Sequence, residues 1–130
     1  MLHKNAVFGR SGVTWIQVAT ASGEPFLSTR DIELDQQYSS FKVIVAYRTA
    51  NLEEGQKFCL EYSPNTTDSW TRAGCWTSGV HFQNHVWSDL ASVFRVRNIA
   101  MNSVRIRLIL ADGEYMDRLF IDRIKISATL

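Results

Sequence analysis

Apolar and polar residues alternate along three stretches of the chain, as they do in β-strands that have one buried face. These stretches are residues 41–49, 58–63 and 104–110. In the first, FKVIVAYRT, one face carries Phe41, Val43, Val45 and Tyr47. In the third, VRIRLIL, one face carries Val104, Ile106, Leu108 and Leu110. Each stretch therefore predicts a strand that contributes one apolar face to a core.

Shorter apolar or β-branched stretches predict the remaining strands. They cover residues 13–19, 25–30, 30–34 and 119–127, with residues 92–96 as either a strand or a helical turn. Residues 77–89 are rich in His, Asn, Gln and Ser and predict a loop followed by a short strand. No segment keeps a helical period, and the pattern gives about eight short strands. Together these observations predict an all-β, antiparallel β-sandwich of jelly-roll type. An immunoglobulin-type sandwich is the alternative.

Residues 58–76 read as a β-hairpin whose loop, residues 64–69, has turn-forming composition. If Cys59 lies directly opposite Cys75, the two can form a disulfide, which we favour over two free thiols. The same register pairs Phe58 with Trp76, Tyr62 with Arg72, and Ser63 with Thr71. Cysteines so close in sequence do not suit the inter-sheet bridge of an immunoglobulin domain.

Length and charge exclude several classes of protein. The 130 residues suit one domain, residues 1–130, which we expect to have been excised from a larger protein that supplies a covalently linked neighbouring domain. A formal net charge of +1 gives no electrostatic reason to expect nucleic acid as a partner. No apolar run approaches the roughly 20 residues that span a bilayer, so we expect no membrane insertion.

Asn65-Thr66-Thr67 is a glycosylation sequon at the predicted hairpin tip. Together with the expected disulfide, a glycan on Asn65 would suit a secreted or extracellular protein.

The longer pattern resembles extracellular β-jelly-roll modules. It consists of YRTANLEEGQKFCLEYSPN, then Ser69-Trp70, then VRIRLILADGEYMDRLFIDRIKI, within residues 41–126. The similarity extends to carbohydrate-binding modules attached to polysaccharide-degrading enzymes and to MAM-type adhesion domains. Many such modules carry an Asp pair on the final strand, whereas here Asp122 is followed by Arg123. The resemblance therefore implies a structural calcium ion only as a possibility, with Asp122 as a candidate ligand, and no other cofactor.

Exposed aromatic rings are the first candidates for ligand binding, because a sugar's apolar face stacks on a flat ring. Trp87 and Trp70 lie in or beside predicted loops, and Tyr115 follows the predicted turn at Asp112-Gly113. A structural role is the alternative for each, and Trp15 and Trp76 are expected in the core.

Polar residues opposite the predicted core positions are the second candidates. They are Lys42, Arg48, Glu61, Arg105 and Arg107. If their strands are neighbours, these side chains share one surface that can bind sugar hydroxyls or grip a carboxylate. The alternative is a solvated face with cross-strand ion pairs.

Metal-binding and catalytic patterns are weak. His81 and His85 lie near Asp89, but their spacing suits zinc only on a helix, so we expect surface histidines and no metal site. The acidic residues Asp112, Glu114 and Asp117 form no recognised catalytic motif. We therefore expect a protein that is not an enzyme.

The sequence predicts a non-catalytic carbohydrate-binding module that attaches a larger secreted enzyme or surface protein to a polysaccharide or oligosaccharide. The alternative is an extracellular protein-interaction domain of the adhesion or receptor-accessory kind.

Overall fold

The computed structural model describes residues 5–8, 14–17, 26–29, 31–65, 67–96, 99–111 and 117–129. The regular structure within these ranges is entirely β-strand. The strands are β1 (Asn5–Phe8), β2 (Thr14–Gln17), β3 (Phe26–Ser28), β4 (Ile32–Glu33), β5 (Ser40–Ala50), β6 (Lys57–Pro64), β7 (Thr71–Thr77), β8 (Ser88–Arg95), β9 (Ser103–Ala111) and β10 (Arg118–Thr129). This part of the chain contains no helix that could span a membrane.

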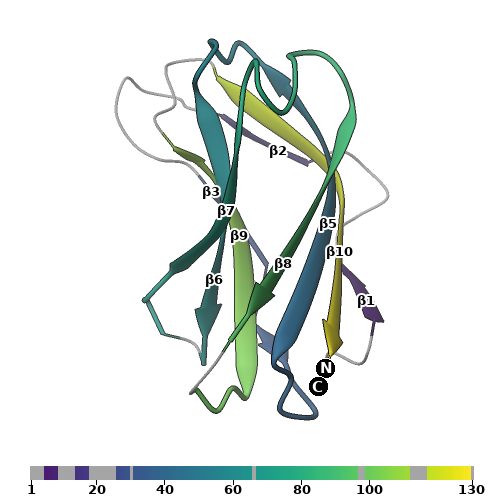
Figure 1. The fold of residues 1–130 in the computed structure, drawn as a ribbon, viewed down its shortest axis with the longest axis vertical. Helices are drawn as coiled ribbons and strands as arrows, with labels where there is room; N and C mark the ends of the chain where they lie inside the picture. The colour runs from purple at the N-terminus through teal and green to yellow at the C-terminus, as the bar shows by residue number, and fades with distance from the viewer. Residues whose placement is uncertain are drawn as a thin grey trace.

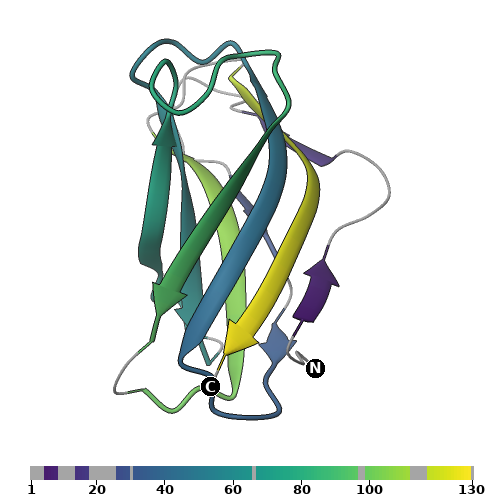
Figure 2. The ribbon, with the colours of Figure 1, turned by 45° about the vertical axis from the view of Figure 1, so that its right-hand side comes forward.

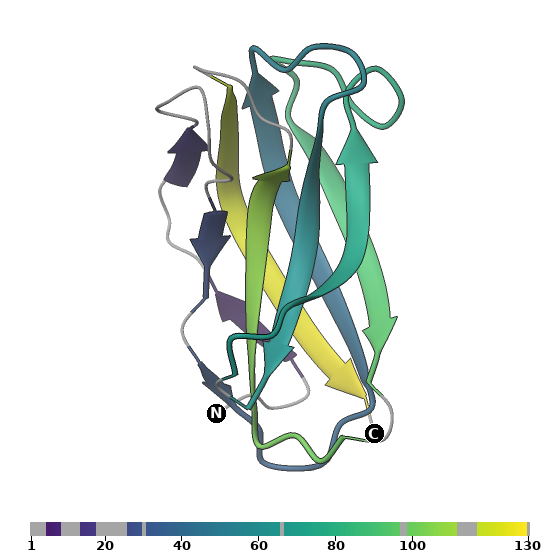
Figure 3. The same ribbon diagram turned by 90° about the vertical axis from the view of Figure 1, so that its left-hand side faces the viewer.

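The strands form two antiparallel sheets that pack face to face (Figure 1). In the first, here the β5 sheet, the order is β1-β10-β5-β8, and β2 also pairs with β10. In the second, here the β9 sheet, the order is β3-β9-β6-β7, and β4 also pairs with β9. Figure 2 brings β8, β5 and β10 of the first sheet forward, and Figure 3 brings the second sheet to the front. The molecule therefore has two outer sheet faces, one on each side of a common core.

Alternation along the strands produces this core, as the sequence predicts. The inner face of β5 buries Phe41, Val43, Val45 and Tyr47. The inner face of β9 buries Val104, Ile106, Leu108 and Leu110. Between the sheets the Tyr47 ring lies edge-on to Phe58 and Phe82, with centroids 4.9 and 5.6 Å away. Packed aromatic and aliphatic side chains from both sheets thus hold the layers together.

The β6–β7 hairpin has the predicted disulfide. Cys59 and Cys75 are directly opposed, with a Cα–Cα distance of 4.1 Å, and their sulfur atoms are bonded. Next to them Phe58 is paired with Trp76, and the two rings stack with centroids 5.7 Å apart. The predicted register is therefore confirmed at this end of the hairpin.

A β-bulge changes the register nearer the turn. Past Leu60, the pairing shifts by one residue, so that Glu61 pairs with Arg72 and Tyr62 with Thr71. The predicted pairs Tyr62–Arg72 and Ser63–Thr71 are therefore wrong. A bulge inserts one extra residue into one strand, and this is not visible in a regular alternation. Its consequence is that Arg72 lies on the same face as Glu61.

The other predicted strands are confirmed with small differences. Residues 92–96 continue the strand β8 and do not form a helical turn, and the loop predicted in residues 77–89 covers residues 78–87. β1 is a four-residue strand that pairs with β10, and the pattern of the sequence does not predict it. The turn expected at Asp112-Gly113 lies outside the described residues.

Removing the disulfide is expected to destabilise the domain. The bridge closes a loop with a sequence separation of 16, for which loop entropy predicts about 3 kcal/mol of stabilisation. The variant Cys59→Ala/Cys75→Ala should therefore lose about 3 kcal/mol in urea unfolding. A reducing agent should bring the wild type to the variant's midpoint and leave the variant unchanged. Equal midpoints for the oxidised wild type and the variant would contradict this role.

Candidate functional site

The predicted polar surface is divided between the two sheets. Lys42 and Arg48 lie on β5, whereas Glu61, Arg105 and Arg107 lie on β6 and β9. These strands belong to different sheets, so the expectation that all five residues share one surface is wrong. Alternation fixes the face of a strand but not the sheet to which the strand belongs. The protein thus has two candidate surfaces.

A buried carboxylate organises the outer face of the β9 sheet. Glu61 is 6% exposed and lies between Arg107 on β9 and Arg72 on β7. Arg107 Nε donates to Glu61 Oε1 at 2.8 Å, and Arg72 Nε donates to Oε2 at 3.0 Å. One carboxylate therefore fixes the positions of two guanidinium groups.

The two arginines also control the ionisation of Glu61. Burial alone would raise the pKa of its carboxyl, but hydrogen bonds and charge from Arg107 and Arg72 outweigh burial, and the pKa lies below its usual value. Glu61 is therefore a carboxylate at neutral pH and accepts hydrogen bonds only.

Aromatic rings cover the Arg107 guanidinium. Its central carbon lies 4.1 Å from the Trp70 ring centroid and 4.9 Å from that of Phe26. The Arg105 guanidinium lies 5.0 Å from the same Trp70 ring. Phe26 is 51% exposed, so this cluster reaches solvent. We call it the Trp70 surface; it consists of Phe26, Glu61, Trp70, Arg72, Arg105 and Arg107.

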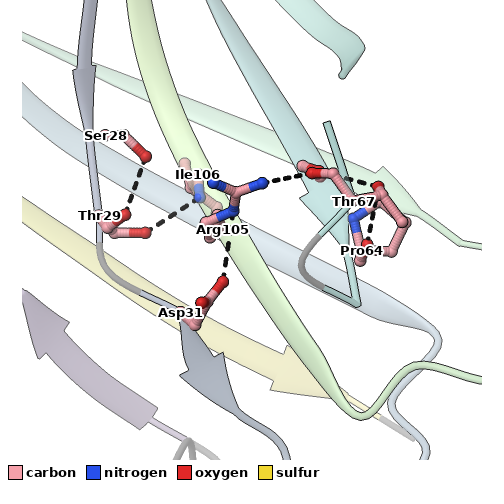
Figure 4. A network of polar contacts seen from close by, with 8 residues as sticks. Ser28, Thr29, Asp31, Pro64, Thr67, Arg105 and Ile106 are labelled. Carbon is pink, nitrogen blue, oxygen red and sulfur yellow. Dashed lines mark hydrogen bonds and ion pairs between the residues drawn. The ribbon is translucent and has the colours of Figure 1, made fainter. Parts of the chain in front are cut away.

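Arg105 ties the β6–β7 loop to the sheet (Figure 4). Its Nη2 donates to the Thr67 carbonyl, and its Nε lies 3.3 Å from Asp31 Oδ1. The buried Ser63 hydroxyl donates to the same Thr67 carbonyl at 2.7 Å. Nearby, Thr29 Oγ1 accepts from the backbone N–H of Ile106 at 3.0 Å. The contacts of Arg105 and Ser63 with Thr67 hold the loop that carries Trp70 against the outer face of the sheet.

Asn65 has a structural role in this loop. It adopts φ 54°, and its side-chain Nδ2 donates to the Ala100 carbonyl at 2.8 Å while Oδ1 accepts from Asn102 N at 2.7 Å. Its amide thus bridges two loops at one end of the sandwich. Glycosylation at Asn65 stays a prediction.

A second aromatic cluster lies on the outer face of the β5 sheet. The Arg48 guanidinium lies 5.4 Å from the Trp87 ring centroid and 4.7 Å from that of Phe120, the residue paired with Arg48 on β10. Trp87 is 45% exposed. Three exposed cations, Lys42, Arg123 and Lys125, lie on β5 and β10 of the same sheet. We call the cluster and these cations together the Trp87 surface; it consists of Lys42, Arg48, Trp87, Phe120, Arg123 and Lys125.

The loop before β8 presents Trp87 in a fixed position. Asn84 Oδ1 accepts from the hydroxyl of the fully buried Thr49 at 2.8 Å, and Asn84 Nδ2 donates to the Leu52 carbonyl at 2.7 Å. The His85 backbone N–H donates to the Thr49 carbonyl at 2.9 Å. These bonds anchor the loop to the end of β5.

Metal binding gains no support from the geometry. Asp122 lies at a β-bulge in β10, and the described ranges contain no group of three or more His, Cys, Asp or Glu side chains that could hold an ion. His81 Nδ1 accepts from the Thr77 backbone N–H at 2.8 Å. The calcium ligand role of Asp122 stays a prediction.

Some predicted residues lie outside the described part of the chain. They are Tyr115, Asp112, Glu114 and the side chain of Trp15. Five residues of the two surfaces are not among the candidates predicted from the sequence, namely Phe26, Arg72, Phe120, Arg123 and Lys125. Arg123 and Lys125 flank the buried Ile124, and this alternation is a usable signal for outward positions. Phe120 alternates with the buried Leu119 and Ile121, which is a usable signal for an outward position. Phe26 and Arg72 reach the Trp70 surface through strand pairing and the bulge, which the sequence does not reveal.

The low pKa of Glu61 predicts a pH-dependent contribution to stability. Because the folded pKa is lowered, the stabilisation is present above the unfolded value of about 4.3 and is lost as pH falls through the folded value. Glu61→Gln should therefore cost about 2 kcal/mol of unfolding free energy at pH 7. This difference should shrink below about pH 4.

Glu33→Gln is the matched control, because it neutralises an exposed carboxylate on a strand of the same sheet. It should stay within about 0.5 kcal/mol of the wild type. A Glu61→Gln cost that is absent at pH 7, or that grows on acidification, would show that the two arginines do not stabilise the carboxylate.

Comparison with known proteins gives structural matches only. No profile of a known protein family matches the sequence, and no curated protein matches it. A solved structure of a CBM4 carbohydrate-binding module superposes over 96% of this chain and 78% of its own, with a TM-score of 0.61 and 15% identity. A CBM61 module, solved in complex with β-1,4-galactotriose, superposes over 95% of this chain and 88% of its own, with a TM-score of 0.53 and 15% identity.

At this identity the comparisons concern the fold alone. The expected similarity to MAM-type domains is not among these findings and stays a prediction. The two antiparallel sheets, together with these matches, show that the chain has the β-jelly-roll fold found in carbohydrate-binding modules.

Proposed function

We propose that this protein is a non-catalytic carbohydrate-binding module and that the Trp70 surface binds its sugar. The observation that carries the proposal is the packing of Trp70 and Phe26 against an arginine that Glu61 already holds in place. Aromatic faces and fixed polar groups, side by side on a rigid sheet, are what a sugar requires.

The charges on this surface suit a neutral sugar. Arg72 and Arg107 are paired with Glu61, and Arg105 is paired with Asp31. Paired groups retain unused donor and acceptor positions for hydroxyls while their net charge is small. Since the side chains are held before binding, little conformational entropy is lost when the sugar arrives.

The same pairing supports a non-catalytic role. A glycosidase needs a carboxylic acid that can donate a proton, and its pKa is typically raised. The pKa of Glu61 is instead lowered, so it does not supply that acid.

The proposal includes attachment to a larger secreted enzyme or surface protein. Its support is the Cys59–Cys75 disulfide, which suits an oxidising compartment, and a fold that the CBM4 and CBM61 modules share. An extracellular protein-interaction domain remains the alternative.

Affinity gel electrophoresis with neutral polysaccharides tests the proposal, followed by calorimetry with β-1,4-galactotriose and other neutral oligosaccharides. Trp70→Ala should weaken binding about tenfold, because it removes the ring from the site. Arg72→Gln should weaken it about fivefold through the loss of charged donors.

Trp87→Ala is the matched control, because it removes an exposed tryptophan from the opposite sheet. It should leave neutral-sugar affinity unchanged while circular dichroism shows that all three variants are folded. Wild-type protein that binds none of the neutral glycans would overturn the proposal and favour a protein partner. Equal affinity in Trp70→Ala and the wild type would move the site elsewhere.

A further inference from the structure

We propose that the Trp87 surface is a second binding site, which takes the extended chain of an acidic, uronate-bearing polysaccharide. It lies on the β5 sheet, on the opposite side of the core from the Trp70 surface. It goes beyond the function proposed above, because it is a separate site with a ligand of different charge.

Positive charge is concentrated on this face. Outward positions of β5, β8 and β10 carry six basic residues against two acidic ones, whereas the whole chain has a net charge of +1. The basic residues are Lys42, Arg48, Arg95, Arg118, Arg123 and Lys125, and the acidic ones are Asp89 and Asp122. Three ion pairs between described residues, Arg72–Glu61, Arg107–Glu61 and Arg105–Asp31, lie on the β9 sheet side, and Lys42, Arg123 and Lys125 take part in none of them. A polyanion would supply the missing charge.

Arg48 is positioned for a carboxylate. It lies against the rings of Trp87 and Phe120, its side chain is partly exposed, and its Nε is buried with no hydrogen bond to any described residue. Because rings cover the face of this guanidinium and Nε is buried, its two terminal nitrogens are the groups left for bidentate hydrogen bonds to a planar anion. The 45% exposed Trp87 beside it offers a ring for the apolar face of a sugar. A uronic acid carries a carboxylate for Arg48 and an apolar ring face for Trp87 in one sugar residue.

The other cations of the Trp87 surface lie in a row along β5 and β10, which suits a polymeric ligand. Lys42 and Arg48 are six residues apart on one face of β5, a span of about 20 Å. Arg123 and Lys125 lie on the adjacent strand β10, about 4.8 Å to the side. The ligand is therefore longer than a single sugar.

Single-stranded nucleic acid is the competing polyanion. Proteins that bind it stack successive bases on aromatic side chains along the groove. Here the two aromatic rings, Trp87 and Phe120, lie at one end of the row of cations, and Trp87 is the more exposed of them. This arrangement favours a ligand that needs many charge contacts and few stacking contacts.

The test is affinity gel electrophoresis with polygalacturonate, its fully methyl-esterified form and a single-stranded oligonucleotide at low ionic strength. Wild-type protein should be retarded by polygalacturonate, and the retardation should fall as salt is raised. The esterified polymer, which lacks the charges, should retard the Trp70→Ala variant, whose neutral-sugar site is impaired, far less than polygalacturonate does. Lys42→Gln/Lys125→Gln and Trp87→Ala should each weaken binding about fivefold.

Lys57→Gln and Trp70→Ala are the matched controls, because they remove a cation and a tryptophan on the β9 sheet side. Both should bind polygalacturonate like the wild type. No retardation by polygalacturonate, equal retardation of Trp70→Ala by the esterified polymer, equal retardation by the oligonucleotide, or unchanged binding in Lys42→Gln/Lys125→Gln would each overturn the second site. Loss of neutral-sugar binding in Trp70→Ala with polygalacturonate binding intact would show that the two sites are independent.

Discussion

The outer face of the β9 sheet depends on the position of Glu61 between two arginines. The disulfide fixes one end of the β6–β7 hairpin, and the bulge after Leu60 then places Arg72 beside Glu61. From the other side, the pairing of β6 with β9 sets Arg107 opposite Glu61. A regular hairpin would place Arg72 on the face of Tyr62, toward the core. The β-bulge thus decides whether the Arg72 side chain lies on the core face or on the outer face of the sheet.

The two outer faces use arginine in different ways. On the β9 sheet, carboxylates hold Arg72, Arg105 and Arg107, so the face presents fixed hydrogen-bonding groups with little net charge. On the β5 sheet, aromatic rings hold Arg48, and no carboxylate in the described ranges forms an ion pair with it. Neutral rings position a guanidinium without cancelling its positive charge, whereas a paired carboxylate offsets that charge. The contrast follows from which side chains the strand pairing brings together, and it supports different ligands for the two faces.

Sequence reasoning succeeded where period and pairing are regular. The burial of Val43 and Ile106 follows from alternation, and the Cys59–Cys75 bridge follows from a hairpin register. It failed where the outcome depends on long-range pairing. Lys42 and Arg107 both lie opposite core positions, but alternation within a strand cannot show that their strands belong to different sheets.

Nuclear magnetic resonance during titration with a neutral β-linked oligosaccharide tests the central claim most directly, because it reports both surfaces in one experiment. The account predicts that the indole N–H resonance of Trp70 and the Nε–H resonance of Arg107 shift as sugar is added, while the indole resonance of Trp87 does not move. Shifts at Trp87 without shifts at Trp70 would contradict it, and so would a spectrum that remains unchanged at saturating sugar.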